Sequence, residues 1–318
     1  MKTIKCAVIG TGYLGQFHAE KYYQLDNAQL IAIVDNDQQQ ATAIAKKFHA
    51  QPLTDYQSLT NIDAVSIATP TQTHFTIAKH FLQQGVHVLV EKPMTTTVEE
   101  ANQLIQLAQQ NHCLLQVGHL ERFNSAIIAL DGVLNSPRFI ESHRIAPFTP
   151  RGTDVSVVLD LMIHDIDLIH SMVCSPITQI MANGAPVLTE HIDIANVRLQ
   201  FANGCVANVT ASRAGLKTER RMRIFQHDAY ISLNLHEKRF SVYRKGSGEM
   251  FPGIPNVKHK KHKFPKSDAI KAEIAAFLDA IIHDKPVVVS GEDGRNALQT
   301  ALDITDTIYQ SIETYYAT

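Results

Sequence analysis

The first 120 residues alternate short apolar runs with longer segments whose apolar residues recur at helical spacing, and this alternation restricts the fold most. The apolar runs, rich in Val, Ile and Leu, lie at 4–10, 30–35, 64–69, 86–93 and 114–119. The helical segments between them cover 14–25, 37–50, 73–85 and 97–112. Buried strands that alternate with helices build βαβ units around a parallel sheet covered on both faces. The sequence therefore predicts a doubly wound α/β domain.

Three glycines follow the first predicted strand directly, in the stretch VIGTGYLG. Gly10, Gly12 and Gly15 have G-x-G-x-x-G spacing and open the first predicted helix. Such glycines allow a tight turn, close approach of the backbone to a pyrophosphate and close packing of helix on strand. Asp35 ends the next strand, where a carboxylate accepts hydrogen bonds from an adenosine ribose and repels a 2′-phosphate. These features predict a dinucleotide site that takes NAD rather than NADP.

The second part of the chain has a different pattern. Strands are predicted at 138–146, 177–185, 194–214 and 221–245, and helices at 123–134, 157–173, 268–284 and 294–312. Asn203-Gly204 and His227-Asp228 fall where hairpin turns are expected. The Gly-, Pro- and Lys-rich stretch 246–266 predicts a loop.

Two domains follow from these patterns. Residues 1–120 form a Rossmann dinucleotide-binding domain, and 121–318 form an α+β domain with a mostly antiparallel sheet for substrate binding and oligomerisation. We expect the last helix, about 294–314, to pack back on the first domain. The partly apolar strands 196–201 and 205–213 predict a homo-oligomer, a dimer or a tetramer, formed through the open face of this sheet.

Charge and composition exclude several classes of protein. A net charge of −2 on 318 residues argues against bulk attraction to nucleic acid or to an anionic membrane. No apolar stretch reaches membrane-spanning length. The four cysteines are far apart and lack C-x-x-C spacing, which is typical of buried thiols in a reducing cytoplasm. They are Cys6, Cys113, Cys174 and Cys205.

The stretch KHKKHKFPK (258–266) concentrates lysine and histidine. It is interpreted as a solvated loop or as a loop that closes over a nucleotide diphosphate. His259 and His262 have no nearby acidic or cysteine partner at metal-ligand spacing, so no metal site is expected.

The predicted helix 157–173 is apolar on most of its surface but carries a polar stripe. Asp160, His164 and Asp167 stand at i, i+4 and i+7, within about 60° of one another, whereas Asp165 points elsewhere. Buried carboxylates are costly unless paired. The stripe is therefore either a structural Asp–His pair or the lining of a polar site.

Three segments together resemble one known family. ATPTQTH (68–74), the E-K-P at 91–93 and the D-x-x-x-H of Asp160 and His164 are similar to the Gfo/Idh/MocA family of NAD(P)-dependent sugar oxidoreductases, over essentially the whole chain. The family usually has Asn where this chain has Thr71. The resemblance and the glycine motif together give the cofactor-binding candidates, which are Gly10, Gly12, Tyr13, Leu14, Gly15, Asp35, Thr69, Pro70, His74, Glu91 and Lys92.

The resemblance also implies that Lys92, Asp160 and His164 meet near the nicotinamide and the reacting carbinol. Oxidation of a secondary alcohol sends a hydride to the nicotinamide and a proton to a base. His164 titrates near neutral pH and is the candidate base, oriented by Asp160. Lys92 is the candidate donor to the oxygen on which negative charge develops. The structural alternative for Lys92 is a salt bridge, for example with Glu91.

A narrower resemblance concerns the substrate. GHLERFNSA (118–126) and the stretch 146–167 are similar to UDP-N-acetylglucosamine 3-dehydrogenases and to UDP-N-acetylglucosaminuronate 3-dehydrogenases. This implies oxidation at C3 of a UDP-linked N-acetylamino sugar for lipid A or surface-polysaccharide precursors, with an aminotransferase acting on the keto sugar. The substrate-binding candidates are Lys92, Arg122, Asn124, Arg144, Arg151, Asp160 and His164.

Other interpretations of the same residues stay open. The arginine fork suits a diphosphate, but an ion pair at a domain interface would equally explain Arg122 and Asn124. A free sugar or a polyol such as inositol is the alternative substrate. A dinucleotide-sensing regulator without catalysis would need the glycines but not Lys92 and His164 together.

Overall fold

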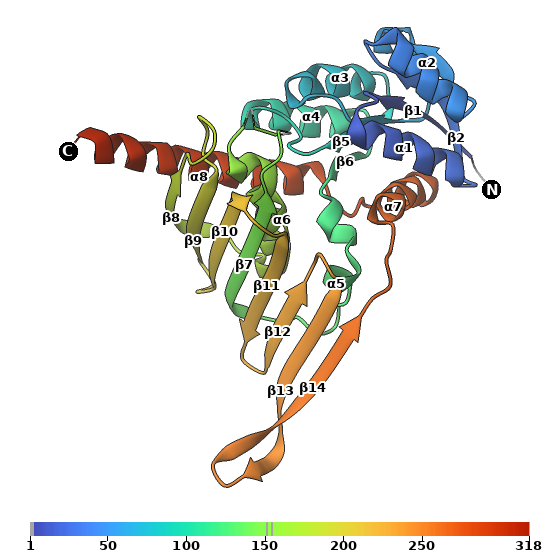
Figure 1. Cartoon of the computed structure of the whole chain (residues 1–318). Helices are drawn as coiled ribbons and strands as arrows, with labels where there is room; N and C mark the ends of the chain where they lie inside the picture. The colour runs from blue at the N-terminus through green and yellow to red at the C-terminus, as the bar shows by residue number, and fades with distance from the viewer. Residues whose placement is uncertain (1–2, 151, 154, 318) are drawn as a thin grey trace. The chain divides into compact units, whose positions relative to one another are not determined.

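The computed structural model describes residues 3–150, 152–153 and 155–317 (Figure 1). It divides into two compact units. The first runs to Phe123 and also includes Asp268–Leu298, whereas the second consists of Asn124–Ser267 and the chain from Gln299 onward. Each unit has its own sheet.

A parallel sheet of six strands forms the centre of the first unit, in the order β3-β2-β1-β4-β5-β6. Its strands are β1 (Ile4–Ile9), β2 (Ala28–Val34), β3 (Gln51–Leu53), β4 (Ala64–Ile67), β5 (His87–Glu91) and β6 (Leu115–Gly118). The helices between them are α1 (Tyr13–Gln24), α2 (Gln38–Lys47), α3 (Thr71–Gln83) and α4 (Val98–Gln110). This strand order is that of Rossmann folds, in which ligands bind at the carboxyl ends of the strands near β1 and β4.

The doubly wound prediction is confirmed. Each predicted strand and helix of this sheet agrees with the structure to within three residues at either end. Thr97 caps α4 and Glu100 bonds back to it, which completes a capping box. The short strand β3 was not predicted, because three residues with a central proline carry almost no periodic signal.

Helix α7 (Ala269–His283) returns from the far end of the chain to complete the core of the first unit. Its side chains Ile274, Phe277 and Leu278 are fully buried, in one cluster with Ile4 of β1 and Tyr22 of α1. Helix α8 (Gly291–Ala317) belongs to the same unit only as far as Leu298. The prediction placed both helices within 121–318, with the last helix packing back on the first domain. The apolar face of α7 is needed to cover α1 and β1.

The second unit contains an eight-stranded sheet in the order β14-β13-β12-β11-β7-β10-β9-β8. Its strands are β7 (Pro137–Pro147), β8 (Ile177–Ala185), β9 (Ile194–Phe201), β10 (Val206–Gly215), β11 (Glu219–Gln226), β12 (Ala229–Asn234), β13 (Arg239–Phe251) and β14 (Ile254–Lys263). Only β7 and β10 pair in parallel, so the prediction of a mostly antiparallel sheet is confirmed. Helix α6 (Ile163–Val173) packs on β7.

Two predictions for this unit are wrong. The stretch 246–266 is not a loop, because β13 and β14 form a long hairpin that extends beyond the neighbouring strands (Figure 1). Cross-strand pairs such as Tyr243 with His259 outweigh the low strand propensity of Gly, Pro and Lys. The predicted helix 123–134 is reduced to a 3₁₀ turn, Leu120–Phe123, and the short α5 (Ser125–Ile128). Gly132, with φ +68°, lies in the turn that follows.

None of the described helices is both long enough and apolar enough to cross a membrane.

Candidate active site

The glycine-rich turn after β1 has the backbone that a dinucleotide site requires. Gly10 has φ +85°, a conformation that favours glycine. A Cβ at Gly15 would lie 1.8 Å from the Gly10 carbonyl oxygen, so only glycine lets α1 pack this closely on the turn. A Cβ at Gly12 would meet no described atom within 4 Å. Space at Gly12 fits a pyrophosphate near the start of α1, where Gly12 is the N-cap and has no side chain to cap the helix.

Asp35 follows β2 and is fixed by three donors from the neighbouring turns. Its Oδ2 accepts from Thr11 N at 2.7 Å and from Thr11 Oγ1 at 2.6 Å, and its Oδ1 accepts from Asp37 N at 3.0 Å. Burial opposes ionisation, but these bonds outweigh it and lower the pKa of Asp35. The carboxylate is therefore charged at neutral pH, as discrimination against a 2′-phosphate requires.

We expect Asp35→Ser to weaken the preference for NAD over NADP by roughly tenfold or more, because like charges about 4 Å apart cost on the order of a few kcal/mol near a protein surface. The measurement is the ratio of the two dissociation constants in wild type and variant. Asp37→Ser is the matched control, since Asp37 caps α2 and serine also caps. A wild type that prefers NADP would overturn the assignment.

The remaining cofactor candidates lie at or after the carboxyl ends of β4 and β5, or at the start of α1. His74 is 1% exposed, with Nδ1 2.9 Å from the Pro93 carbonyl oxygen and Nε2 2.9 Å from that of Thr69. It thus ties the segment after Lys92 to the end of β4. Burial lowers the pKa of His74, although both carbonyls and the charge of Glu91 oppose the shift. Pro70 is the N-cap of α3.

At the start of α1, Tyr13 is 65% exposed and stacks edge-on against Phe17, and Leu14 is half-buried. Glu91, the last residue of β5, bonds to His18 of α1 at 3.0 Å. Lys92 follows it and is half-buried. All cofactor candidates therefore belong to the first unit.

In the second unit the D-x-x-x-H pair lies where a π-helix becomes an α-helix. Asp160 is in the π-helical segment Val158–Met162, and His164 is in the first turn of α6. Both are half-buried, whereas Asp165 and Asp167 are 1% exposed. A Cβ at Gly152 would lie 2.9 Å from Asp160 Oδ2, so the backbone closely approaches this carboxylate. Short π-helical segments inside helices are frequent at functional sites.

A support for this helix was missed by the sequence analysis. Arg213 donates to the carbonyl oxygens of Gly152 and Val155, both at 2.6 Å, and lies 3.5 Å from Asp193. The side chain of Asp193 in turn accepts backbone N–H bonds from Val187, Leu188 and Thr189. Together these bonds fix the segment that leads into Asp160. The sequence signal for this support was an aspartate directly before a predicted strand, Asp193 before β9. A single aspartate at a strand end is too common to predict such a role.

The pH dependence of Asp193 is a testable consequence. Burial alone would raise its pKa, but the backbone donors outweigh this and lower the pKa from 3.8 to about 2. A carboxyl whose pKa is lower in the folded state stabilises the protein above the unfolded-state value and loses this contribution as pH falls toward 2. We expect Asp193→Asn to lower the free energy of unfolding by roughly 2 kcal/mol at pH 7 and by less at pH 3. Urea titrations at both values measure this, and an equal loss at both would contradict it.

The substrate candidates have different surroundings. Arg144 is 3% exposed and forms a buried ion pair with Asp165, which also accepts from Ser142 Oγ at 2.8 Å. Asn124 caps α5 and donates to the Leu235 carbonyl oxygen at 3.0 Å. Arg122 lies 3.7 Å from Asp293. Arg151 is outside the described residues.

These contacts favour structural roles for Arg144 and Asn124. Asp165 of α6 forms a structural ion pair with Arg144. Lys92 belongs to the first unit, and Asp160 and His164 belong to the second.

Comparison with known proteins decides the family. A model of the oxidoreductase family with an NAD-binding Rossmann fold matches residues 4–119, and a model of the GFO/IDH/MocA C-terminal domain matches residues 131–232. The chain belongs to the Gfo/Idh/MocA family. It is an NAD-binding oxidoreductase, and its relatives include dehydrogenases of a nucleotide sugar and of an inositol.

Two relatives show where the chain lies within the Gfo/Idh/MocA family. The chain is 40% identical to a UDP-N-acetylglucosamine 3-dehydrogenase of Acidithiobacillus ferrooxidans, over 95% of this chain and 96% of the relative. A solved structure of that dehydrogenase superposes with a TM-score of 0.91 at 39% identity, covering 97% and 98% of the two chains. A scyllo-inositol 2-dehydrogenase of Bacillus subtilis is 24% identical over 95% and 93%.

Proposed function

We propose that this protein oxidises the 3-hydroxyl of UDP-N-acetylglucosamine to the 3-keto sugar and that NAD is its oxidant. The observation that carries the proposal is the 40% identity, over nearly the full length of both chains, to a dehydrogenase of that name. The sequence at 118–126 and 146–167 supports it, because these segments resemble the same group of enzymes. A polyol substrate has weaker support, since the inositol dehydrogenase is 24% identical.

The proposed roles follow from the chemistry of three side chains. When bound, NAD supplies the hydride acceptor. His164 accepts the hydroxyl proton, and Asp160, four residues before it, orients the imidazole and stabilises its charged form. Lys92 donates to the oxygen on which negative charge develops. The glycine turn holds the pyrophosphate, and Asp35 binds the adenosine ribose.

The test is NADH formation with a panel of substrates. We expect UDP-N-acetylglucosamine to react with a kcat/KM roughly 10²-fold or more above that of N-acetylglucosamine or myo-inositol, because binding energy from the remote UDP group assists the reacting centre. Mass spectrometry of the product should show the loss of two hydrogens. UDP-N-acetylglucosaminuronate distinguishes the two kinds of 3-dehydrogenase. Faster turnover of an inositol would replace the nucleotide-sugar assignment by the polyol one.

We also propose a homo-oligomer formed through the open face of the eight-stranded sheet. An aromatic ladder crosses this face on adjacent strands, with ring centroids 4.2–5.7 Å apart. Its members are Phe139, Phe225, Tyr230, Tyr243 and His259. Phe225 is 36% exposed, although its neighbours Met222 and Ile224 are fully buried on the other face. A continuous aromatic stripe on an open sheet favours coverage by a second copy.

We expect Tyr230→Glu to shift the protein to a smaller oligomer, because it places a charge in the middle of the ladder. Light scattering at micromolar concentration measures the mass. Tyr23→Glu on α1, an exposed tyrosine of the first unit, is the control and should leave the mass unchanged. A monomeric wild type would contradict the proposal.

The cellular setting is part of the same proposal. Cys6, Cys113, Cys174 and Cys205 are all free thiols, which fits a reducing cytoplasm. A 3-keto sugar nucleotide is a substrate for an aminotransferase, and the diamino product suits lipid A or a surface polysaccharide.

A further inference from the structure

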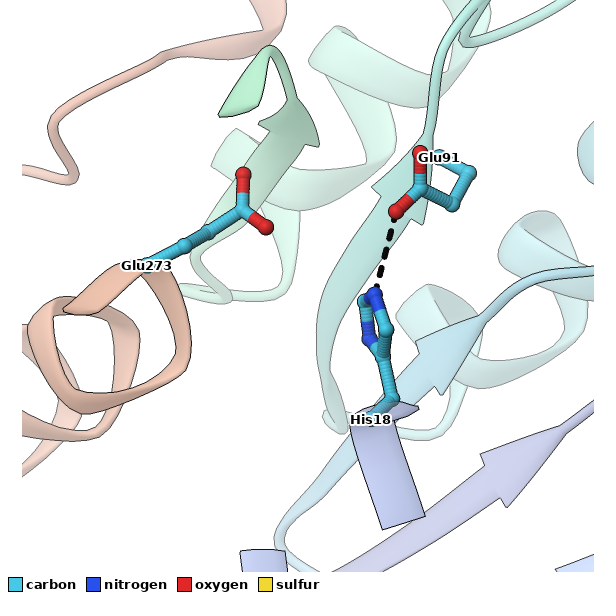
Figure 2. Close-up of side chains that lie close together, drawn as sticks. All are labelled: His18, Glu91 and Glu273. Carbon is cyan, nitrogen blue, oxygen red and sulfur yellow. Dashed lines mark hydrogen bonds and ion pairs between the residues drawn. The ribbon is translucent and has the colours of Figure 1, made fainter. Parts of the chain in front are cut away.

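Three titratable side chains from distant parts of the sequence converge inside the first unit. His18 lies on α1, Glu91 ends β5 and Glu273 lies on α7 (Figure 2). One nitrogen of His18 and one carboxylate oxygen of each glutamate lie within 4.8 Å of one another. The Glu273 side chain extends from α7 toward the other two. His18 and Glu273 are each 1% exposed. Glu91 of this cluster directly precedes Lys92 in the chain.

Two residues of this cluster, His18 and Glu273, have buried polar atoms without a hydrogen bond. His18 Nε2 and Glu91 Oε1 are 3.0 Å apart, a normal hydrogen bond. Within the described part of the chain, His18 Nδ1 and both carboxyl oxygens of Glu273 are buried without a hydrogen-bond partner. An unsatisfied buried polar atom costs roughly 1–3 kcal/mol, and a charged one costs more. An ionised Glu273 would only accept hydrogen bonds, so it would leave a buried charge without a donor.

The charges around the cluster also oppose two ionised carboxylates. Burial by itself would raise the pKa of Glu91, but the hydrogen bond from His18 and the electrostatic interactions with His18, Lys92 and His74 outweigh it, so the pKa is lowered. The pKa of Glu273 is raised well above its usual value by burial and by the charge of Glu91. Tyr22, whose hydroxyl pairs with Ser66 at 2.8 Å, and the thiol of Cys6 are the other titratable neighbours. Both are neutral near pH 7, since burial raises the pKa of each.

A bound cation fits the same three groups less well than a proton does. The three ligand atoms lie within 4.8 Å of one another. His18 Nε2 and Glu91 Oε1 are already joined by a hydrogen bond of 3.0 Å, so a cation that bound both atoms would have to break this bond. Such a rearrangement is costly in a close-packed core.

We propose that Glu273 is a neutral carboxylic acid whose O–H reaches His18 Nδ1 through one bridging water, and that the cluster thereby keeps one negative charge, on Glu91, beside Lys92. This arrangement determines which atoms of the cluster carry a proton. Because an ionised Glu91 only accepts hydrogen bonds, the proton of the His18–Glu91 bond is on Nε2. Nδ1 is then an acceptor, and Glu273 is the neighbouring group that has a proton to give.

The effect of this cluster on the reaction rests on the proposed function, because it depends on the proposed role of Lys92. A single carboxylate beside Lys92 places one negative charge next to its side chain at the end of β5. Gly118 of β6 belongs to this arrangement, because a Cβ there would lie 2.9 Å from Glu91 Oε2. Glu273 is therefore a positioning residue, which acts on Lys92 through His18 and Glu91.

Two substitutions of Glu273 distinguish a hydrogen-bond donor from a side chain that only fills space. Glu273→Gln keeps the shape, stays neutral and retains an N–H donor for Nδ1. We expect its kcat/KM to stay within about threefold of wild type. Glu273→Leu fills a similar volume but removes the donor, and we expect at least a tenfold loss. Asp279→Asn, an exposed carboxylate on the same helix, is the control and should match wild type.

Spectroscopy measures the proton itself, independently of any substrate. Infrared spectra at pH 8 should contain a carboxylic-acid C=O band in wild type that is missing in Glu273→Gln and kept in Asp279→Asn. ¹⁵N NMR should find His18 as a neutral ring protonated on Nε2. Absence of that band, or an imidazolium at His18, overturns the inference. So does a stoichiometric divalent cation in protein purified without chelator that Glu273→Gln loses.

Failure of the proposed function gives a different result. If the infrared band is present but no UDP sugar reacts with the wild type, the substrate assignment is wrong and the buried acid stands. If UDP-N-acetylglucosamine reacts but Glu273→Gln is as impaired as Glu273→Leu, the enzyme assignment stands and the donor role of Glu273 fails.

Discussion

Replacement of Lys92 by Met or of His164 by Ala is expected to lower turnover of UDP-N-acetylglucosamine by roughly 10²-fold or more in each case. His164→Ala removes the proposed base for the hydroxyl proton. Lys92→Met removes the proposed donor to the reacting oxygen but keeps a side chain of similar length. Steady-state kinetics at saturating NAD measure both losses.

The dissociation constant of NAD is the control for these variants. It should barely change, because the pyrophosphate and the ribose are assigned to the glycine turn and to Asp35. Asp160→Asn should be milder than His164→Ala if Asp160 only orients the ring. The double variant Lys92→Met/His164→Ala should lose less than the product of the single losses, since both residues act on one hydroxyl group.

A structural role for the polar helix would produce the opposite pattern. The Asp160 and His164 variants would keep turnover but unfold at lower temperature, because half-buried polar side chains would lose their partners. Thermal unfolding of each variant beside its kinetics therefore separates the two interpretations. Unchanged turnover in Lys92→Met would remove Lys92 from the reaction.

The first unit could be predicted closely because its signals are local. The glycine motif, Gly10, Gly12 and Gly15, is a local signal within six residues. In the structure a Cβ at Gly10 or Gly15 would clash with neighbouring backbone, whereas the space beside Gly12 is open. The carboxyl end of β2 positions Asp35 directly. Periodicity located β1, β2 and β4 to β6 because they are buried on both faces.

Long-range contacts explain most of what could not be predicted. The return of α7 to the first unit depends on contacts with α1, more than 200 residues earlier in the chain. Glu273 was a lone acid among the apolar positions of that helix, a signal that has meaning only once Glu91 and His18 are placed. The β13–β14 hairpin was missed because cross-strand pairing is absent from a composition-based interpretation.

Arg144 illustrates a different limit. An arginine before the helix that carries His164 suits a diphosphate, and its sequence context gives no reason to reject that role. In the structure its guanidinium is buried and paired with Asp165. Buried and exposed arginines have the same local sequence signal, because the partner is 21 residues away on another element. Its role is decided by a stability measurement.

We expect Arg144→Met to lower the free energy of unfolding by about 3–5 kcal/mol, because it leaves the Asp165 carboxylate buried without its cation. Asp165→Leu alone should cost a similar amount for the converse reason. The double variant Arg144→Met/Asp165→Leu should recover much of the loss, since apolar side chains of similar volume can replace a buried ion pair at little net cost. Urea midpoints of the four proteins measure this cycle. If Arg144→Met instead keeps its stability and loses affinity for the UDP sugar, Arg144 contacts the diphosphate as the sequence first suggested, and the ion pair with Asp165 is dispensable for folding.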